Sequence, residues 1–142
     1  MNTSRMLAFD PNYEPFPCHE GDEVFANGIF QFNISHMMEH IHSGSLIVKT
    51  ERIDVNRWFK THYRPSVNEK HLQTVDIKIP VIQAEIRPGK YSIIDGNHRM
   101  ERAYREGAQY VDSYKLQAEQ LVPYFVNKQG YKAFIDYWNS KL

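Results

Sequence analysis

The sequence predicts one domain of mixed α+β class, with a small mixed sheet, flanking helices and a C-terminal helical extension. Three observations carry this prediction. Stretches with strand-like alternation or branched residues are separated by stretches with helical spacing. A Pro88-Gly89 turn joins two strand-like stretches as a hairpin. The chain of 142 residues is also long enough to bury a core.

The first part of the chain, residues 1–24, is predicted to form an extended arm. It contains three prolines and several acidic residues, and Phe9, Tyr13 and Phe16 are expected to hold it on the body of the protein. The predicted organisation is completed by a core over residues 25–116 and a helical extension over residues 117–142, packed on that core.

The elements that follow the arm are predicted from periodicity and capping residues. Alternation over 30–34 indicates a half-buried strand. A helix is expected from Ser35, as its N-cap, to Ser43, with Gly44 as its stop. Residues 46–55, rich in branched side chains, then indicate a second strand.

The middle of the chain, residues 56–76, has a helical pattern that Pro65 interrupts. Trp58 lies in the first short helix, and Ser66 and Glu69 have the spacing of a capping box that opens a second one. The remaining predictions are strands over 80–87, 90–95 and 110–116, a helix over 97–106 ended by Gly107, and helix from about 117 in two pieces, split near 127–130.

Charge and cysteine content restrict the class of function. The chain has 17 basic and 17 acidic residues, so it lacks the overall basic charge typical of a duplex DNA binder. Cys18 is the only cysteine, which rules out an internal disulfide. There is no apolar run near the length of about 20 residues that a membrane helix needs. We therefore expect a cytoplasmic protein with no membrane partner.

The strongest candidate site is the turn from Asp95 to Arg99, where a predicted strand meets a predicted helix. The first turn of a helix has free N–H groups and the positive end of the dipole, and is therefore a ready anion site. Gly96 permits a sharp turn, and Asn97 is a suitable N-cap. His98 and Arg99 oppose the dipole, a conflict that a bound anion would remove, and Arg99 can grip two phosphate oxygens.

The same residues also fit a structural interpretation. Asp-Gly is a common turn dipeptide, and Asn97 is suited to capping the helix. In that case His98 would bond a carbonyl, and Arg99 would pair with Glu106 or another carboxylate. Local chemistry alone leaves both interpretations open.

Residues 91–107 resemble the signature of the ParB/sulfiredoxin superfamily. In that signature a hairpin strand runs into a Gly-x-x-Arg turn, and the next helix has a small residue four positions after the arginine and ends at a glycine. Upstream, a strand ending at Ile53-Asp54 and the entry to the hairpin at 79–81 follow the order of the family. The resemblance covers about residues 46–116 and implies a ParB/sulfiredoxin-like fold.

The resemblance also implies a nucleotide site. In relatives this turn holds the phosphates of CTP in chromosome-partitioning ParB proteins, of ATP in sulfiredoxins and of ADP in a free-serine kinase. The expected phosphate contacts in this chain are Gly96, Asn97, His98 and Arg99, with Arg102 one turn later. Residues 66–71, at the opening of the preceding helix, would face them. The donors there are Asn68, Lys70 and His71.

A catalytic role is implied for Asp95 and His98. Asp95 would act as a base or hold Mg²⁺ beside ATP, ADP or CTP, and His98 would neutralise phosphate charge during nucleotide hydrolysis or phosphoryl transfer. Asp95 also fits a cap or turn-stabilising aspartate. Sulfiredoxin chemistry is not expected, because Asn97 replaces the cysteine that it needs.

Two other functions stay open at this point. One is a ParB-like nuclease or DNA-binding module, which would need a basic groove. The other is a non-catalytic protein-interaction domain. Separately, His36, Glu39 and His40 have the His-x-x-Glu-His spacing of zinc ligands on a helix, but the sequence offers no third ligand. An amphipathic helix with Met37 in the core explains the same residues.

Overall fold

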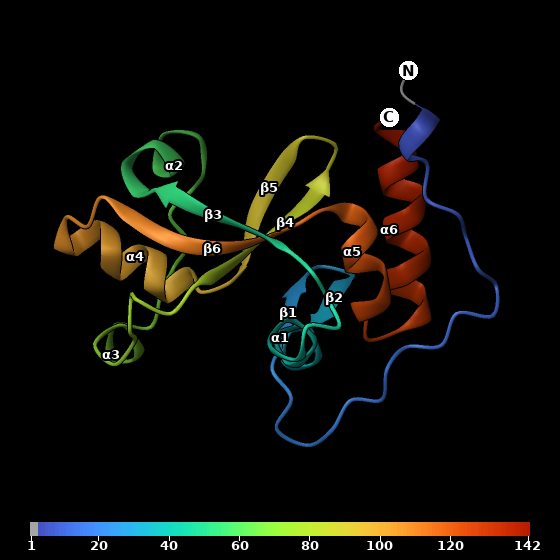
Figure 1. The fold of residues 1–142 in the computed structure, drawn as a ribbon, viewed down its shortest axis with the longest axis horizontal. Helices are drawn as coiled ribbons and strands as arrows, with labels where there is room; N and C mark the ends of the chain where they lie inside the picture. Colours follow the sequence, from blue (N-terminus) through green and yellow to red (C-terminus); the bar gives the residue numbers. More distant parts are fainter. Residues whose placement is uncertain (1–2) are drawn as a thin grey trace. The chain divides into compact units, whose positions relative to one another are not determined.

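The computed structural model describes residues 3–142; residues 1 and 2, the start of the predicted arm, lie outside the described residues. It confirms the mixed α+β class (Figure 1). The elements are the 3-10 helices η1 (Thr3–Arg5) and η2 (Val122–Tyr124), the strands β1 (Val24–Asn27), β2 (Phe30–Asn33), β3 (Lys49–Asp54), β4 (Val81–Arg87), β5 (Lys90–Asp95) and β6 (Tyr110–Leu116), and the helices α1 (Ile34–Ser43), α2 (Val55–Thr61), α3 (Glu69–Leu72), α4 (Asn97–Glu106), α5 (Ala118–Leu121) and α6 (Lys128–Ser140).

The chain divides into two compact units. Unit 1 consists of Met1–Ile47, Glu85–Lys90 and Gln117–Leu142, and unit 2 consists of Val48–Ala84 and Tyr91–Leu116. Each unit therefore contains segments that are far apart in the sequence, and the tip of the β4–β5 hairpin belongs to unit 1.

The four-stranded sheet has the order β3-β6-β4-β5 and is mixed, as predicted. Strands β3 and β6 pair antiparallel, with Ile53 opposite Val111, whereas β4 and β6 run parallel, with Val81 opposite Ser113. Strand β3 begins at Lys49, so the prediction of a strand from residue 46 placed its start too early.

The core of unit 2 lies between one face of this sheet and the helices α2 and α4. Because side chains alternate along a strand, Ile53, Val81 and Val111 project from the same face. Met100 and Ala103 of α4 pack against them and are almost fully buried. Packing on this face explains why the apolar residues of α4 recur at helical spacing.

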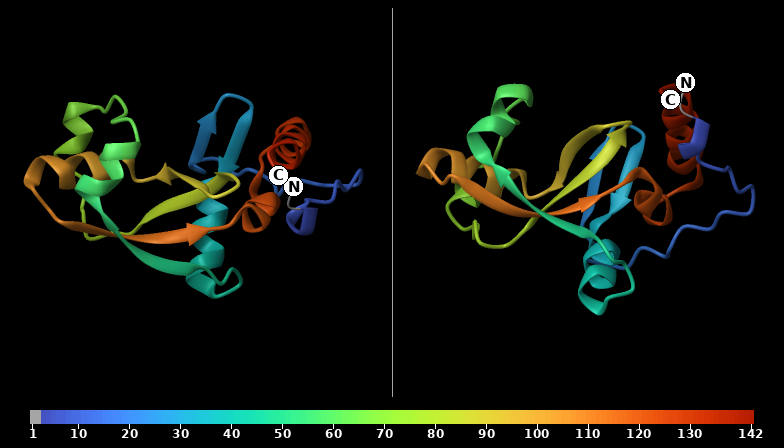
Figure 2. Two further views of the ribbon diagram at one scale, coloured as in Figure 1. Left: turned by 90° about the horizontal axis from the view of Figure 1, so that it is seen from above. Right: turned by 45° about the horizontal axis from the view of Figure 1, so that its top comes forward.

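Unit 1 is built around aromatic side chains of β2, α6 and the segment between α5 and α6. The ring of Phe32 lies 4.7 Å from that of Phe125, which in turn lies 5.2 Å from that of Phe134. The arm joins this core, and in both views of Figure 2 η1 lies beside the end of α6. There the side chain of Asn139 accepts a hydrogen bond from the N–H of Leu7 and donates one to its carbonyl, at 2.9 and 3.0 Å.

The N-caps of helices α1 and α3 differ from prediction. Helix α1 is capped by Asn33 rather than Ser35, since the Asn33 side chain accepts the N–H of His36 at 3.0 Å. Ser35 already lies inside the helix, where its hydroxyl accepts the N–H of Glu23 at 2.8 Å.

The structure also has a β1–β2 hairpin of which only the second strand was predicted.

Helix α3 is capped by Asn68, so the predicted Ser66 capping box is wrong. The Asn68 side chain accepts the N–H groups of Lys70 and His71, at 3.0 and 3.2 Å. Asn68 has extended backbone angles and stands directly before the first helical residue, Glu69, whereas Ser66 lies too far upstream to cap this helix.

Within residues 3–142, none of the helices has both the length and the apolar character needed to cross a bilayer.

Candidate functional site

Gly96 forms the turn at the centre of the candidate site. It is the N-cap of α4 and has a φ of +101°, in the left-handed region that favours glycine. A Cβ atom on Gly96 would lie 2.5 Å from Cγ1 of Val81, so the chain here passes too close to β4 for any side chain. The predicted cap Asn97 is instead the first residue of the helix, because the chain turns at Gly96.

This turn leaves the start of α4 open. Among the described residues, no side chain caps the helix, since Gly96 has none to offer. The N–H groups of the first turn, including those of Asn97, His98 and Arg99, have no partner within a helix. They carry the positive end of the helix dipole, which favours an anion at this position.

Arg99 is held rigidly beside these groups. Its Nη1 donates to the carbonyls of Pro80 and Ile79, at 2.7 and 3.2 Å, and its Nη2 donates to Oδ2 of Asp95 at 3.0 Å. Both side chains of the Asp95–Arg99 pair are largely buried. The structural interpretation expected Arg99 to pair with Glu106 or another carboxylate; its partner is Asp95, and Glu106 pairs with Arg102. Two guanidinium N–H groups remain outside the bonds that the described residues make.

His98 connects the start of α4 to the start of α3. Its Nε2 accepts the N–H of Asn68 at 3.1 Å, which assigns the proton of the neutral ring to Nδ1. Burial, with a further contribution from nearby His71, lowers the pKa of His98. His98 is therefore neutral at pH 7 and offers an Nδ1–H donor rather than the cation that the sequence suggested.

The predicted α3 residues do lie near α4. The rings of His71 and His98 meet edge to face, with centroids 4.5 Å apart. Asn68 uses its side-chain oxygen as the cap of α3. Lys70 is exposed, and within the described part of the chain its ammonium group has no ion-pair partner. The structure thus brings Asn68, His71 and His98 together.

Arg102 makes contacts inside unit 2. Its Nη1 donates to the carbonyls of Gln73 and Val75, at 2.8 and 2.9 Å, and its Nε donates to Glu106 at 2.8 Å. In the structure Arg102 therefore ties the end of α3 to α4, a role that spacing along α4 did not predict.

Glu101, on α4 close to the candidate site, is a charged residue of this helix that the fold buries. Its side chain is only 2% exposed and accepts hydrogen bonds from Arg64 Nε at 2.9 Å and Arg105 Nε at 2.7 Å. Hydrogen bonding from Arg64, more than any other cause, lowers the pKa of Glu101. The Glu101–Arg105 spacing was visible in the sequence, but Arg64 lies in a loop with no periodic signal.

The residues around the turn fit Mg²⁺ only in part. The described residues contain no group of three His, Cys, Asp or Glu side chains that could hold a metal ion. Asp95 is a single carboxylate, and one of its oxygens already accepts from Arg99. Mg²⁺ is often bound by one or two carboxylates together with substrate phosphates and water, so Asp95 fits a metal that arrives with a nucleotide.

The His36 and His40 pair lies in unit 1 on one face of α1, as its spacing predicts. However, the Phe16 ring packs edge-on against both imidazoles, at 5.6 and 5.4 Å between centroids. His40 Nδ1 is hydrogen-bonded to the Tyr124 hydroxyl at 2.8 Å. Met37 is fully buried, so this face of α1 belongs to the core.

The turn at Gly96 therefore brings together backbone N–H groups, a fixed guanidinium and a neutral imidazole within unit 2. Such a set can bind a multiply charged anion by hydrogen bonding and charge together. Comparisons of the chain with protein-family models, with curated proteins and with solved structures found no match.

Proposed function

We propose that the Gly96–Arg99 turn binds the phosphate groups of a nucleotide, ATP, ADP or CTP, in a ParB/sulfiredoxin-like domain, and that the protein hydrolyses this nucleotide or transfers a phosphoryl group from it. The observation that best supports the proposal is the uncapped start of α4 with Arg99 fixed beside it. Gly96 allows the turn to pack directly on Val81 and brings the Arg99 guanidinium next to the start of the helix.

In this proposal each residue has a defined part. The N–H groups of Asn97 and His98 bind the phosphate nearest to the helix axis, and Arg99 contributes its unused donors. The Nδ1–H group of neutral His98 adds a hydrogen bond without adding charge. Lys70, on α3, adds a positive charge. Its exposed side chain can turn towards the phosphates without breaking an ion pair, because it has no ion-pair partner among the described residues.

Asp95 has two parts in the proposal. One carboxylate oxygen pairs with Arg99 and orients its guanidinium. The other oxygen would hold the hydroxyl group that accepts the phosphoryl group, or a nucleotide-bound Mg²⁺. When bound, Mg²⁺ supplies charge neutralisation on the phosphates. Catalysis of this kind comes mainly from positioning and electrostatics, so few residues are needed.

The test is thermal unfolding of the protein with Mg²⁺ and, in turn, ATP, ADP, CTP and GTP. A nucleotide at 100 times its dissociation constant should add roughly 2.7 kcal/mol of stability, and so raise the midpoint. Lys70→Glu should weaken the shift by repelling the phosphates while leaving the fold intact, since Lys70 is exposed. Lys60→Glu, at an exposed position on α2, is the matched control.

Arg99→Ala should abolish the shift, although it also removes bonds to Pro80 and Asp95. Lys70→Glu therefore separates loss of binding from loss of fold. Release of inorganic phosphate, measured with and without EDTA, then decides whether a bound nucleotide is turned over. If none of the four nucleotides raises the midpoint, the proposal fails and the interaction-domain function takes its place. Salt-sensitive DNA binding without a nucleotide shift would favour the nuclease function instead.

A further inference from the structure

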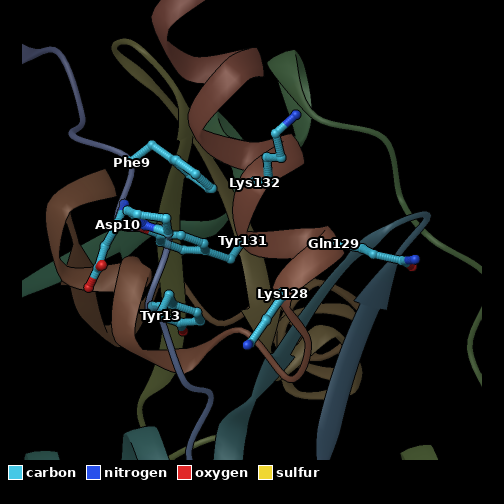
Figure 3. Close-up of a pocket in the computed structure, with 8 residues that line it drawn as sticks. Phe9, Asp10, Tyr13, Lys128, Gln129, Tyr131 and Lys132 are labelled. Atoms are coloured by element: carbon cyan, nitrogen blue, oxygen red, sulfur yellow. Dashed lines mark hydrogen bonds between the residues drawn. The ribbon is translucent and has the colours of Figure 1, made fainter.

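A cavity lies in unit 1, where the arm crosses the start of α6 (Figure 3). Its volume is about 200 Å³, and its lining is almost entirely apolar. The residues that matter for its chemistry are Phe9, Asp10 and Tyr13 of the arm and Lys128, Tyr131 and Lys132 of α6. None of them belongs to the Gly96 turn.

The aromatic walls of the cavity are fixed in place. The rings of Tyr13 and Tyr131 stack face to face, with centroids 3.7 Å apart and planes within 3° of parallel. The Tyr131 hydroxyl accepts the N–H of Asp10 at 2.8 Å, and the Tyr13 hydroxyl donates to the carbonyl of Val122 at 2.7 Å. Both polar ends are thus satisfied within unit 1, and the cavity is preformed rather than dependent on a ligand.

Two ammonium groups stand at the rim. Lys128 pairs with Glu14 at 3.0 Å, and Lys132 lies 3.8 Å from Asp136. More than half of each of these four side chains is exposed, and exposed pairs of this kind contribute little and are readily exchanged. The first turn of α6 contains no acidic residue, so the helix dipole adds to the positive potential.

Asp10 is the one acidic residue in the cavity lining. Figure 3 shows its carboxylate turned away from the ammonium groups of Lys128 and Lys132. The Asp10 carboxylate also accepts the N–H of Asn12 at 2.8 Å, which holds it in that direction. The lysine side of the rim therefore carries two ammonium groups, each paired with one exposed carboxylate that a bound anion can replace, while the interior is apolar.

We propose that this cavity binds a small aromatic carboxylate, with one planar ring in the cavity and the carboxylate at the rim, where it replaces Glu14 at Lys128 or Asp136 at Lys132. An apolar cavity of about 150 Å³ is known to bind benzene, so the volume here fits one ring with a small substituent. Phe9 of the arm lines the cavity and packs towards Tyr131, with centroids 5.7 Å apart. This site is independent of the nucleotide site proposed above.

The test uses benzoate as the probe, with benzamide as its uncharged isostere and acetate as the ion without a ring. Titrations of the full chain are followed by amide NMR shifts of residues 128–132. Benzoate should bind at least about tenfold more tightly than benzamide, because a charge-assisted hydrogen bond is lost in the amide. Acetate should cause no saturable shift.

Three variants complete the test. Phe9→Ala, at a half-exposed position, should weaken benzoate by removing a wall, and Lys128→Gln with Lys132→Gln should reduce the preference for benzoate over benzamide to near one. Lys141→Gln, at the other end of α6, is the control and should change nothing. Equal binding of benzamide and benzoate, an equal effect of Lys141→Gln, or no benzoate binding at all would overturn the proposal.

Discussion

At the scale of single residues, Gly96 is the position where backbone geometry and packing most strictly require glycine. Its φ of +101° already disfavours a side chain, and β4 passes directly behind it at Val81. The first condition comes from the sharp turn between β5 and α4, and the second from the packing of that turn on the sheet.

The first prediction of stability concerns Gly96→Ala. It should lower the free energy of unfolding by roughly 2–4 kcal/mol, because the added Cβ meets both backbone strain and the Val81 side chain. Gly107→Ala, at the other end of α4, is the matched control. It has a φ of +73° with nothing within 4 Å, so it should cost only about 1 kcal/mol. Equal losses in urea unfolding would contradict the steric explanation.

At the scale of elements, α4 organises most of unit 2 through its side chains. Arg99 reaches the entry of β4, Arg102 holds the end of α3, and Glu101 binds Arg64 in the loop that leads to Asn68. These contacts place the start of α3 opposite the start of α4. The position of Asn68 and His71 therefore depends on Arg102 and Glu101, two side chains that have no phosphate contact in the proposed function.

A pH-dependence follows from Glu101. Its pKa in the folded protein lies below the usual value of 4.5, so its contribution to stability is present above that value and is lost as the pH falls through the lower folded pKa. Urea midpoints measured between pH 7 and pH 3 should fall with acidification. The fall should be smaller in Glu101→Gln, which should already lose about 1.5–3 kcal/mol at pH 7.

Glu106→Gln is the control for this series, since Glu106 lies on the same helix but is 45% exposed. It should change the midpoint at pH 7 by less than about 1 kcal/mol. A pH profile for Glu101→Gln identical to that of the unchanged protein would show that Glu101 has no special part in acid unfolding.

At the scale of the whole molecule, unit 1 shows how distant segments of the chain are joined. Arg5 of η1 donates to Glu85 of the hairpin tip, at 2.6 and 3.1 Å, and to Glu119 of α5, at 2.7 and 3.0 Å. Its guanidinium also lies over the Trp138 ring, 4.9 Å from the centroid. One side chain near the start of the chain thus links all three segments of unit 1.

Arg5→Ala should therefore be strongly destabilising. It leaves the Glu85 carboxylate, only 3% exposed, without its guanidinium, which we expect to lower the free energy of unfolding by about 3–5 kcal/mol. Arg87→Ala, at an exposed position of β4, should change it by less than about 0.5 kcal/mol. Adding Glu85→Gln to Arg5→Ala should restore part of the loss in chemical denaturation, since the buried charge is then removed. A similar loss in Arg5→Ala and Arg87→Ala would contradict this role.

The elements that sequence predicted best are those with strong local signals. The strand from Lys90 to Asp95, the helix from Asn97 to Glu106 and the strand from Tyr110 to Leu116 were predicted with the bounds that the structure has. The first strand of the hairpin begins at Val81, one residue later than predicted. Turn residues and periodicity act within a few positions, so they can be read without the rest of the chain. The N-caps of α1 and α3 were predicted wrongly. Asn33 and Asn68 lie close to Ser35 and Ser66, and asparagine and serine side chains can both cap a helix.

The sequence by itself determined the α+β class, the hairpin and the sharp turn from Asp95 to Arg99 as a candidate anion site. Only the tertiary structure decided the partners of these residues. It paired Arg99 with Asp95, buried Glu101 between two arginines and made His98 a neutral acceptor for Asn68. These outcomes depend on which segments meet in space, and side-chain burial and long-range hydrogen bonds leave no periodic trace along the chain.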